Sequence, residues 1–385
     1  MDLSRARDAR AGGERDGPSP APGTARVAVL LVNLGTPDSP GVSDVRRYLR
    51  EFLSDPRVLD MNPIGRALLL HGVILRTRPR RSAAAYAKVW TEAGSPLLAF
   101  SRRLRDGVAA VLGGGFQVEL AMRYGRPSIE SALERLLADR PALLVVAPLF
   151  PQYASAATGS ALARVLEVLA GRRFDGRRPE LRTLPAFYDD PGWLHAWAAV
   201  GRERLQAFEP DHVLFSYHGL PERQIRALDS SGAHCLAKPD CCDAIGSANR
   251  ACYRAQCFAT TRGLVAALEL PGGGSRPGTP WSVSFQSRLG RTPWIRPHTD
   301  VVVPELARRG VRRLAVLCPA FVSDCLETLE EIDIRLREQW RAEGGEDMLL
   351  VPCPNAHPAW VAALADLVRN LARTGESGER RESGE

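Results

Sequence analysis

Residues 27–32 read Val-Ala-Val-Leu-Leu-Val, a continuous apolar run typical of a strand that is buried on both faces. Six more short apolar runs lie at residues 118–121, 143–148, 212–216, 282–285, 314–318 and 348–351. Helical spacing of apolar side chains is found between the runs, at residues 129–138, 159–169, 192–207 and 325–341. This alternation predicts an α/β fold with doubly wound parallel sheets, and the chain is long enough for two such lobes.

The 385 residues, 45% of them apolar, suffice for two packed cores. We expect a disordered arm at residues 1–25, an N-terminal lobe at 26–190, a C-terminal lobe at 191–372 and a disordered tail at 373–385. A loop rich in Pro, Gly and Ser is expected at residues 272–280.

The sequence contains neither a signal-peptide pattern nor the roughly 20 consecutive apolar residues that a membrane-crossing helix needs. It therefore predicts a cytoplasmic protein. The net charge of +7 comes from basic residues that are spread over the predicted helices without a nucleic-acid-binding motif. Nucleic acid is thus not an expected partner, whereas anionic lipid head groups and substrate carboxylates could use the same surplus. The oligomeric state stays open.

Residues 62–81 combine apolar side chains, such as Ile64 and Leu68, with five arginines. This composition suits a lip that dips into a lipid interface, which would make the protein peripheral at the inner face of the cell membrane. A buried helix beside a basic loop is an equal alternative.

Two predicted strands lead into side chains that can carry chemistry. Residues 212–216 run into His218, and a neutral imidazole can accept protons or bind a divalent metal, although a lone histidine is more often structural. Residues 314–318 run into a predicted helix on which Asp324, Glu327 and Glu331 share one face. Acidic residues also favour helix starts for electrostatic reasons alone, so neither pattern decides the function by itself.

With six further blocks, these two strand exits resemble the ferrochelatase family. The eight blocks, in the family's order, are residues 32–37, 94–97, 122–125, 148–153, 216–221, 285–288, 293–294 and 324–331. The resemblance covers residues 26–370 and implies two flavodoxin-like lobes of the class II chelatase type around a porphyrin cleft. It also implies a lyase of haem biosynthesis that inserts Fe²⁺ into protoporphyrin IX, giving protohaem and two protons.

Site residues are implied by the same resemblance. His218 matches the family's essential histidine and Glu327 its facing carboxylate, so we assign proton abstraction and iron ligation to His218, and a proton or metal relay to Glu327 and Glu331. The implied cleft-lining residues are Tyr86, Ser95, Arg123, Tyr124, Ser287 and Trp294.

Arg78 and Arg81 match basic positions that hold propionates, and a solvated basic turn is the alternative for them. Asp38 stands where the coproporphyrin-using branch has a tyrosine, which favours protoporphyrin IX as the substrate.

Five of the eight cysteines lie in an insertion at residues 230–257, namely Cys235, Cys241, Cys242, Cys252 and Cys257. In a reducing compartment such a group favours metal binding over disulfides, and thiolates suit iron–sulfur clusters or zinc. Because some ferrochelatases carry a [2Fe-2S] cluster, the resemblance implies one here. Four of the five would hold it, and we favour the set without Cys241. Zinc and free thiols are the alternatives.

The other cysteines, Cys318, Cys325 and Cys353, are interpreted as buried apolar residues, although Cys325 stands where other members have a histidine.

Two alternative functions are compatible with parts of this sequence pattern. A related class II chelatase would act on sirohydrochlorin or coproporphyrin III. A non-catalytic haem or iron–sulfur sensor would keep the fold, but the intact His218 and Glu327 argue against it.

Overall fold

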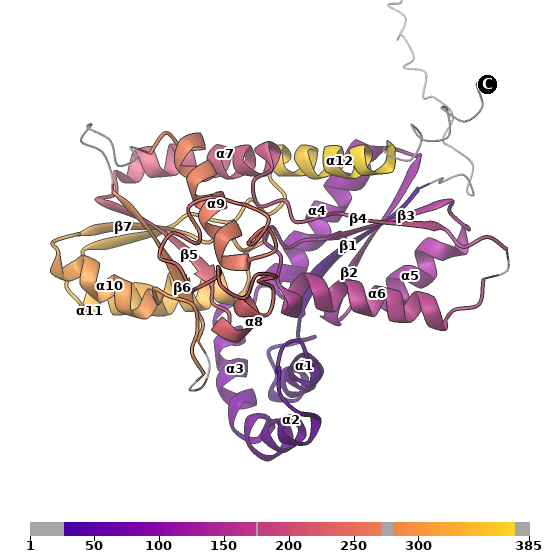
Figure 1. Ribbon diagram of the computed structural model, residues 1–385, viewed down its shortest axis with the longest axis horizontal. Helices are drawn as coiled ribbons and strands as arrows, with labels where there is room; N and C mark the ends of the chain where they lie inside the picture. Colours follow the sequence, from indigo (N-terminus) through magenta and orange to yellow (C-terminus); the bar gives the residue numbers. More distant parts are fainter. Residues whose placement is uncertain (1–26, 175, 271–279, 289, 291, 374–385) are drawn as a thin grey trace, which may run out of the picture.

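The computed structural model describes residues 27–174, 176–270, 280–288, 290 and 292–373 (Figure 1). The arm expected at residues 1–25 lies outside the described residues. Of the loop expected at residues 272–280, only residue 280 is among the described residues. Of the tail expected at residues 373–385, only residue 373 is described.

The described residues form two four-stranded parallel sheets, one in each lobe (Figure 1). The N-terminal sheet has the order β2-β1-β3-β4, from β1 (Val27–Thr36), β2 (Phe116–Gly125), β3 (Leu143–Pro148) and β4 (Glu180–Thr183). The C-terminal sheet has the order β6-β5-β7-β8, from β5 (His212–His218), β6 (Trp281–Gln286), β7 (Arg313–Leu317) and β8 (Asp347–Leu350). Each lobe therefore repeats one topology, and the predicted α/β class is confirmed.

Helices cover both sheets and also form a projection below them (Figure 1). The N-terminal half contains α1 (Val42–Ser54), α2 (Pro63–Leu69), the π-helix η1 (Leu70–Ile74), α3 (Leu75–Val89), α4 (Pro96–Leu112), α5 (Ile129–Ala138), the π-helix η2 (Ser155–Gly159) and α6 (Ser160–Gly171). The C-terminal half contains α7 (Pro191–Phe208), α8 (Glu222–Arg226), α9 (Tyr253–Ala267), α10 (Thr299–Arg308), the π-helix η3 (Glu327–Leu336), α11 (Arg337–Ala342) and α12 (Pro358–Arg373). Among the described residues no helix combines the length and apolar character of a membrane span.

Alternate residues of the strands point to opposite sides, as in any strand buried on both faces. Leu30 of β1 packs with the side chains of α5 and α6, whereas Leu31 packs into a core that also contains Phe215 of β5. The two lobes thus share one apolar core and hold each other in place.

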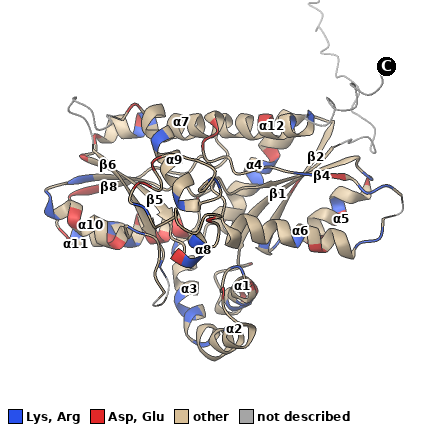
Figure 2. Cartoon of the chain, viewed as in Figure 1, with Lys and Arg blue, Asp and Glu red and all other residues tan. Residues whose placement is uncertain are grey.

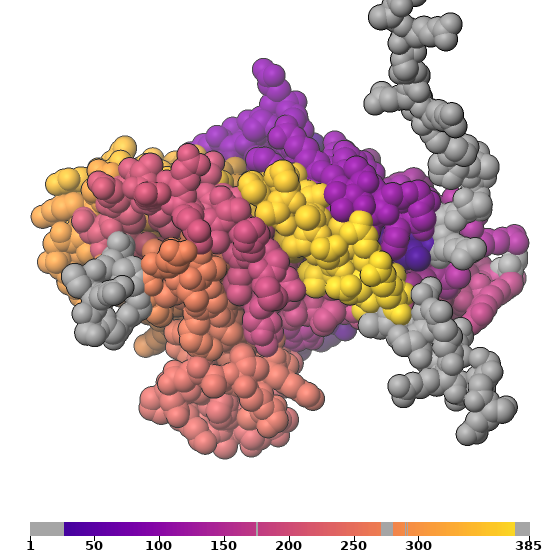
Figure 3. Space-filling view, turned by 90° about the horizontal axis from the view of Figure 1, so that it is seen from above, coloured from indigo at the N-terminus to yellow at the C-terminus, as the bar shows by residue number. Residues whose placement is uncertain are grey.

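Helix α12 returns from the second lobe to the first, where it packs on α4 and β3 as well as on α7 (Figure 3). Arg182 of β4 donates to the carbonyl oxygens of Leu371 and Ala372 at its end. The lobe expected at residues 191–372 is therefore not self-contained, because its last helix completes the cover of the N-terminal sheet.

Candidate active site

A cleft lies where the carboxyl ends of both parallel sheets meet, as is usual for ligand sites in doubly wound folds. It is bordered by the exits of β1, β3, β5 and β7 together with parts of α1, α3, α4 and η3. Polar side chains in its lining are Asn33, Thr36, Tyr48, Tyr86, Ser95, Gln152, His218, Tyr253, Ser323, Cys325 and Glu327. Apolar atoms make up most of the rest, so the cleft suits a largely apolar ligand that needs a few polar contacts.

His218 is the last residue of β5 and reaches this cleft. Its Nδ1 atom lies 2.7 Å from the carbonyl oxygen of Gly219. A carbonyl oxygen can only accept, so this contact assigns the proton of a neutral ring to Nδ1 and leaves the lone pair on Nε2. The imidazole is thereby prepared to accept a proton at Nε2.

The peptide that follows His218 is held on both sides. The N–H of Gly219 donates to the carbonyl oxygen of Gln286 at 2.7 Å, and the hydroxyl of Tyr253 donates to the carbonyl oxygen of His218 at 2.9 Å. A Cβ atom on Gly219 would lie 2.8 Å from the Gln286 carbonyl oxygen and 3.3 Å from the Trp294 ring, so this close approach requires glycine. Tyr253 belongs to none of the motifs in the sequence, because it lies within the cysteine-rich segment.

Glu327 begins the π-helix η3 and borders the same cleft as His218. The amide of Gln286 donates to its backbone carbonyl oxygen at 3.0 Å, which ties the start of η3 to the end of β6. π-Helices are rare and often occur at functional sites. Here the i→i+5 hydrogen bonds replace the regular α-helical spacing that we expected after residue 324.

Asp324 does not share a face with Glu327, contrary to the prediction. It is buried and accepts hydrogen bonds from the amide of Asn355 at 2.7 Å and the hydroxyl of Thr328 at 3.0 Å. Burial raises the pKa of Asp324 despite these bonds. The carboxylate therefore supports the turn before η3 and is not part of the cleft lining.

Glu331 and Ser287 contact each other beside the cleft, since the hydroxyl of Ser287 donates to the Glu331 carboxylate. Arg335 lies 3.8 Å from the same carboxylate. Trp294 forms a backbone bridge with Pro221, just beyond His218. These three predicted residues are absent from the described lining of the cleft and contact segments next to His218 and Glu327.

Tyr86 and Ser95 line the cleft from the N-terminal lobe, where we expected them. Burial and the nearby charge of Glu327 raise the pKa of the Tyr86 hydroxyl. Ser95 accepts a hydrogen bond from the hydroxyl of Thr36 at 2.8 Å, so the start of α4 is joined to the end of β1.

Arg123 and Tyr124 lie behind the cleft and are absent from its described lining. Both bind the Asp55 carboxylate, Arg123 at 2.8 Å and Tyr124 at 2.9 Å, and both also contact the hydroxyl of Ser160. Burial raises the pKa of Asp55, but the hydrogen bonds from Ser160, the Arg57 N–H and Tyr124 outweigh it, so the pKa is lowered overall. This network joins the end of α1 to α6 and so supports the cleft indirectly.

Arg78 and Arg81 are exposed on α3, below the cleft. Neither has a hydrogen bond or an ion pair among the described residues. Figure 2 shows the basic residues of α3 on the projection formed by α1, α2 and α3.

All eight cysteines are buried, and none of them forms a disulfide. The Cys242 sulfur lies 3.8 Å from that of Cys241, and the side chain of Cys252 shifts the pKa of both the Cys235 and the Cys242 thiol. The side chains of Tyr253 and Cys242 both act on the pKa of the Cys257 thiol, which burial raises. Cys241 and Cys242 thus form the one thiol–thiol contact among the described cysteines. Nevertheless, nowhere in the described part of the chain do three metal-binding side chains converge as they would around an ion.

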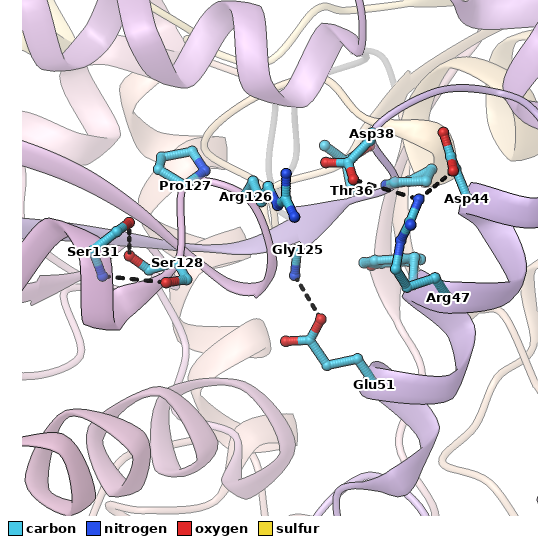
Figure 4. A pocket seen from close by; sticks show the side chains of 12 residues that line it. Thr36, Asp38, Asp44, Arg47, Glu51, Gly125, Arg126, Pro127, Ser128 and Ser131 are labelled. Carbon is cyan, nitrogen blue, oxygen red and sulfur yellow. Dashed lines mark hydrogen bonds and ion pairs between the residues drawn. The ribbon is translucent and has the colours of Figure 1, made fainter. Parts of the chain in front are cut away.

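A second, polar pocket adjoins the cleft and shares Thr36 and Tyr48 with it (Figure 4). Glu51 accepts a hydrogen bond from the N–H of Gly125 at 3.0 Å, while Arg47 pairs with Asp44 and lies 3.7 Å from Asp38. Burial raises the pKa of Glu51. The candidate catalytic residues His218 and Glu327 do not line this pocket.

The chain matches the family model described as ferrochelatase over residues 26–372. A ferrochelatase of Azotobacter vinelandii (strain DJ / ATCC BAA-1303) is 51% identical, and the match covers 89% of this chain and 98% of that protein. A ferrochelatase of Coxiella burnetii (strain Dugway 5J108-111) is 46% identical, with 89% and 93% covered. One of Pseudomonas fluorescens (strain Pf0-1) is 48% identical, with 88% and 96% covered. The chain therefore belongs to the ferrochelatase family, and its reaction is the insertion of ferrous iron into a porphyrin.

Proposed function

We propose that His218 removes the pyrrole protons of protoporphyrin IX and ligates the incoming Fe²⁺, while Glu327 and Glu331 relay protons or metal. The porphyrin loses two protons as Fe²⁺ binds its four nitrogens, so the charge of the product balances. One observation carries this proposal: His218, with its lone pair on Nε2, and Glu327 border the same cleft from the exits of the neighbouring strands β5 and β7.

A relay along η3 is supported by the position of Glu331. It follows Glu327 on the π-helix and lies 3.8 Å from Arg335, whose side chain is half exposed. A proton that reaches Glu331 is thus close to water. The hydroxyl of Ser287, which donates to Glu331, would hold this carboxylate in place.

Substrate binding is assigned to the remaining site residues. Tyr86 and Ser95, which line the cleft, and Trp294, which pairs with Pro221 beyond His218, would form walls against the macrocycle. Arg78 and Arg81, which have no described acidic partner, would bind the propionates. A well-formed charge-assisted hydrogen bond to a carboxylate contributes about 1.5–3 kcal/mol. For Arg123 and Tyr124 a supporting role through Asp55 replaces the expected direct contact.

An anaerobic assay with Fe²⁺ tests the substrate assignment. Protoporphyrin IX and coproporphyrin III are supplied in parallel, and the metalloporphyrin absorption bands are followed with time. We expect protohaem to form faster than the coproporphyrin product. Faster metallation of coproporphyrin III would contradict the choice that rests on Asp38.

We further propose that Cys235, Cys241, Cys242 and Cys252 hold a [2Fe-2S] cluster. The donor set fits, because the four thiols are buried, the Cys241 and Cys242 sulfurs lie 3.8 Å apart, and the guanidinium of Arg254 lies 3.0 Å from the Cys242 sulfur, where it would offset thiolate charge. The thiols must close further around the irons than they do here. A bound cluster would link the insertion covalently to the start of α9, and we assign it no step of the metallation.

Anaerobically purified protein decides between cluster and zinc. We expect visible absorption and two irons with two sulfides per chain. Stoichiometric zinc in a colourless protein would contradict the cluster. A Cys241→Ser variant should lose the absorption. Cys257→Ser should keep it if Cys235, Cys241, Cys242 and Cys252 are the ligands.

We also propose that the projection α1–α3 touches the membrane, so that a cytoplasmic enzyme binds peripherally at its inner face. Ile64, Leu68 and Val73 are 75%, 68% and 52% exposed at the tip of this projection, beside the arginines of α3. Exposed apolar residues next to basic ones suit a lipid interface.

Flotation with vesicles that contain anionic lipid tests the membrane contact. The wild-type chain should float at low salt, and the Ile64→Glu/Leu68→Glu variant should not. Leu166, which is 53% exposed on α6, provides the matched control as Leu166→Glu. Equal flotation of all three proteins would exclude a contact through this tip.

A further inference from the structure

Tyr253 stands where the cysteine insertion meets the active-site strand. It is the first residue of α9 and directly follows Cys252, the buried N-cap residue whose side chain acts on the pKa of Cys235 and Cys242. Its side chain is only 5% exposed and borders the cleft beside His218. Figure 3 shows the insertion as a separate bulge on the body of the molecule, so this tyrosine is one of its links to the site.

The hydroxyl of Tyr253 fixes one half of the peptide between His218 and Gly219. It donates to the His218 carbonyl oxygen at 2.9 Å, while the Gly219 N–H is held by Gln286 at 2.7 Å. With both polar groups bound, rotation of this peptide plane would break a hydrogen bond in the core.

The orientation of that peptide matters because the next carbonyl oxygen, that of Gly219, accepts the Nδ1 proton of His218 at 2.7 Å. Such outer contacts set the tautomer and the direction of a reacting imidazole. If the peptide turned, the Gly219 oxygen would leave Nδ1, and the lone pair would no longer be confined to Nε2.

The position of Tyr253 depends on the insertion, because Tyr253 directly follows Cys252 at the start of α9. The carbonyl oxygen of Cys252 accepts from the N–H of Gln256 at 3.0 Å in the first turn of α9, so Cys252 and Tyr253 move with the helix start. Gln256 in turn accepts from the N–H of Tyr153 at 2.6 Å, which joins this turn to the N-terminal lobe. Cys252 and Tyr253 are joined by one peptide bond. A movement of the Cys252 backbone when the four thiols rearrange would therefore also move Tyr253.

We propose that Tyr253 is a positioning residue for His218, and that it transmits the state of the cysteine insertion to the imidazole. The first part rests on the role proposed above for His218, and the second on the cluster proposed above for the insertion. The cysteine segment thus adjusts the reacting base without contacting the substrate.

Tyr253→Phe removes only the hydroxyl and tests the first part. We expect kcat with Fe²⁺ and protoporphyrin IX to fall roughly tenfold, with both KM values changed less than about twofold. In protein labelled with ¹⁵N-histidine, the Nε2 resonance of His218, identified by its loss in His218→Gln, should shift toward that of a mixture of tautomers. Tyr217→Phe is the matched control, because the Tyr217 hydroxyl contacts Thr261 in the same core.

Cys252→Ser tests the second part. The variant should lose the cluster absorption and show the same His218 shift as Tyr253→Phe, and the double variant should be no slower than either single one. Should Cys252→Ser fail to fold, wild-type protein stripped with a chelator replaces it in the same NMR measurement.

Wild-type kcat and an unchanged His218 resonance in Tyr253→Phe would overturn the positioning role. Cluster loss that leaves this resonance unchanged would overturn the transmission. Both outcomes differ from failure of the proposed function, which is seen as full activity of a variant that lacks His218.

Discussion

The ammonium group of Lys88 lies 3.4 Å from the carboxylate of Glu330, and this ion pair joins α3 of the N-terminal lobe to the π-helix η3 of the C-terminal lobe. Glu330 is buried and also binds Arg335 at 2.9 Å. Both cations are half exposed. The carboxylate thus has two partners at the boundary between the lobes, three residues after Glu327.

Because Glu330 has two cationic partners, we expect replacement of both to lower the free energy of unfolding by more than the sum of the single losses. Lys88→Met or Arg335→Met alone should lower the free energy of unfolding by no more than about 1 kcal/mol, because Glu330 keeps one cation. The double variant should lose roughly 3 kcal/mol, since a buried carboxylate is then unpaired. Urea unfolding measures this, and a double-variant loss equal to the sum of the single losses would show that the pairs act independently.

Replacement of the candidate base should remove turnover and leave substrate binding. His218→Ala is expected to lower kcat at least about 100-fold, the lower end of what a positioned general base contributes. His195, exposed on α7 and remote from the cleft lining, gives the control variant His195→Ala, which should keep wild-type kcat. Porphyrin binding, followed by fluorescence quenching, should be similar in both. Wild-type turnover in His218→Ala would refute the catalytic assignment.

Because His212 is buried, we expect the free energy of unfolding to fall in acid. Burial and the charge of Arg309 lower the pKa of His212 to about 4, from an ordinary value near 6.5. Between these values the unfolded chain binds a proton that the folded chain does not, so stability falls as the pH drops from about 6.5 to about 4. This one group accounts for up to about 3 kcal/mol.

His212→Asn should keep the contact to Ser282, which lies 2.8 Å from the ring, better than an apolar residue would. Between pH 7 and pH 4 the unfolding free energy of wild type should therefore fall by up to about 3 kcal/mol more than that of the variant. Parallel curves would mean that His212 does not titrate in this range.

Gly35 in β1 should not tolerate a side chain. Its φ angle is +124°, and an added Cβ atom would lie 1.8 Å from the carbonyl oxygen of Tyr124 on the neighbouring strand. Because backbone cannot move aside cheaply, Gly35→Ala should cost more than about 3 kcal/mol or prevent folding.

Gly72→Ala in η1 is the control, since nothing lies within 4 Å of the added carbon there. A helical position of this kind should gain up to about 1 kcal/mol from alanine. Thermal unfolding compares the two variants, and similar melting temperatures would contradict the close approach at Gly35.

Strands β1, β3 and β7 were readable in the sequence because continuous apolar runs have few other stable uses. Strand β4 was missed, since Glu180–Thr183 is a short edge strand with polar side chains that resembles a loop. The π-helix η3 was expected as an α-helix, because both begin with the same acidic residues and differ only in hydrogen-bond register.

The sequence by itself determined the α/β class and the family, and it pointed to His218 and Glu327 as candidate site residues, because those inferences depend on local apolar runs and on ordered motifs. Tertiary structure alone decided which motif residues share the cleft. It placed Arg123, Tyr124 and Asp324 in buried networks, brought the Cys241 and Cys242 thiols together, and set Tyr253 against His218. The physical reason is that a side chain's partners are set by the packing of distant segments, which no local pattern records.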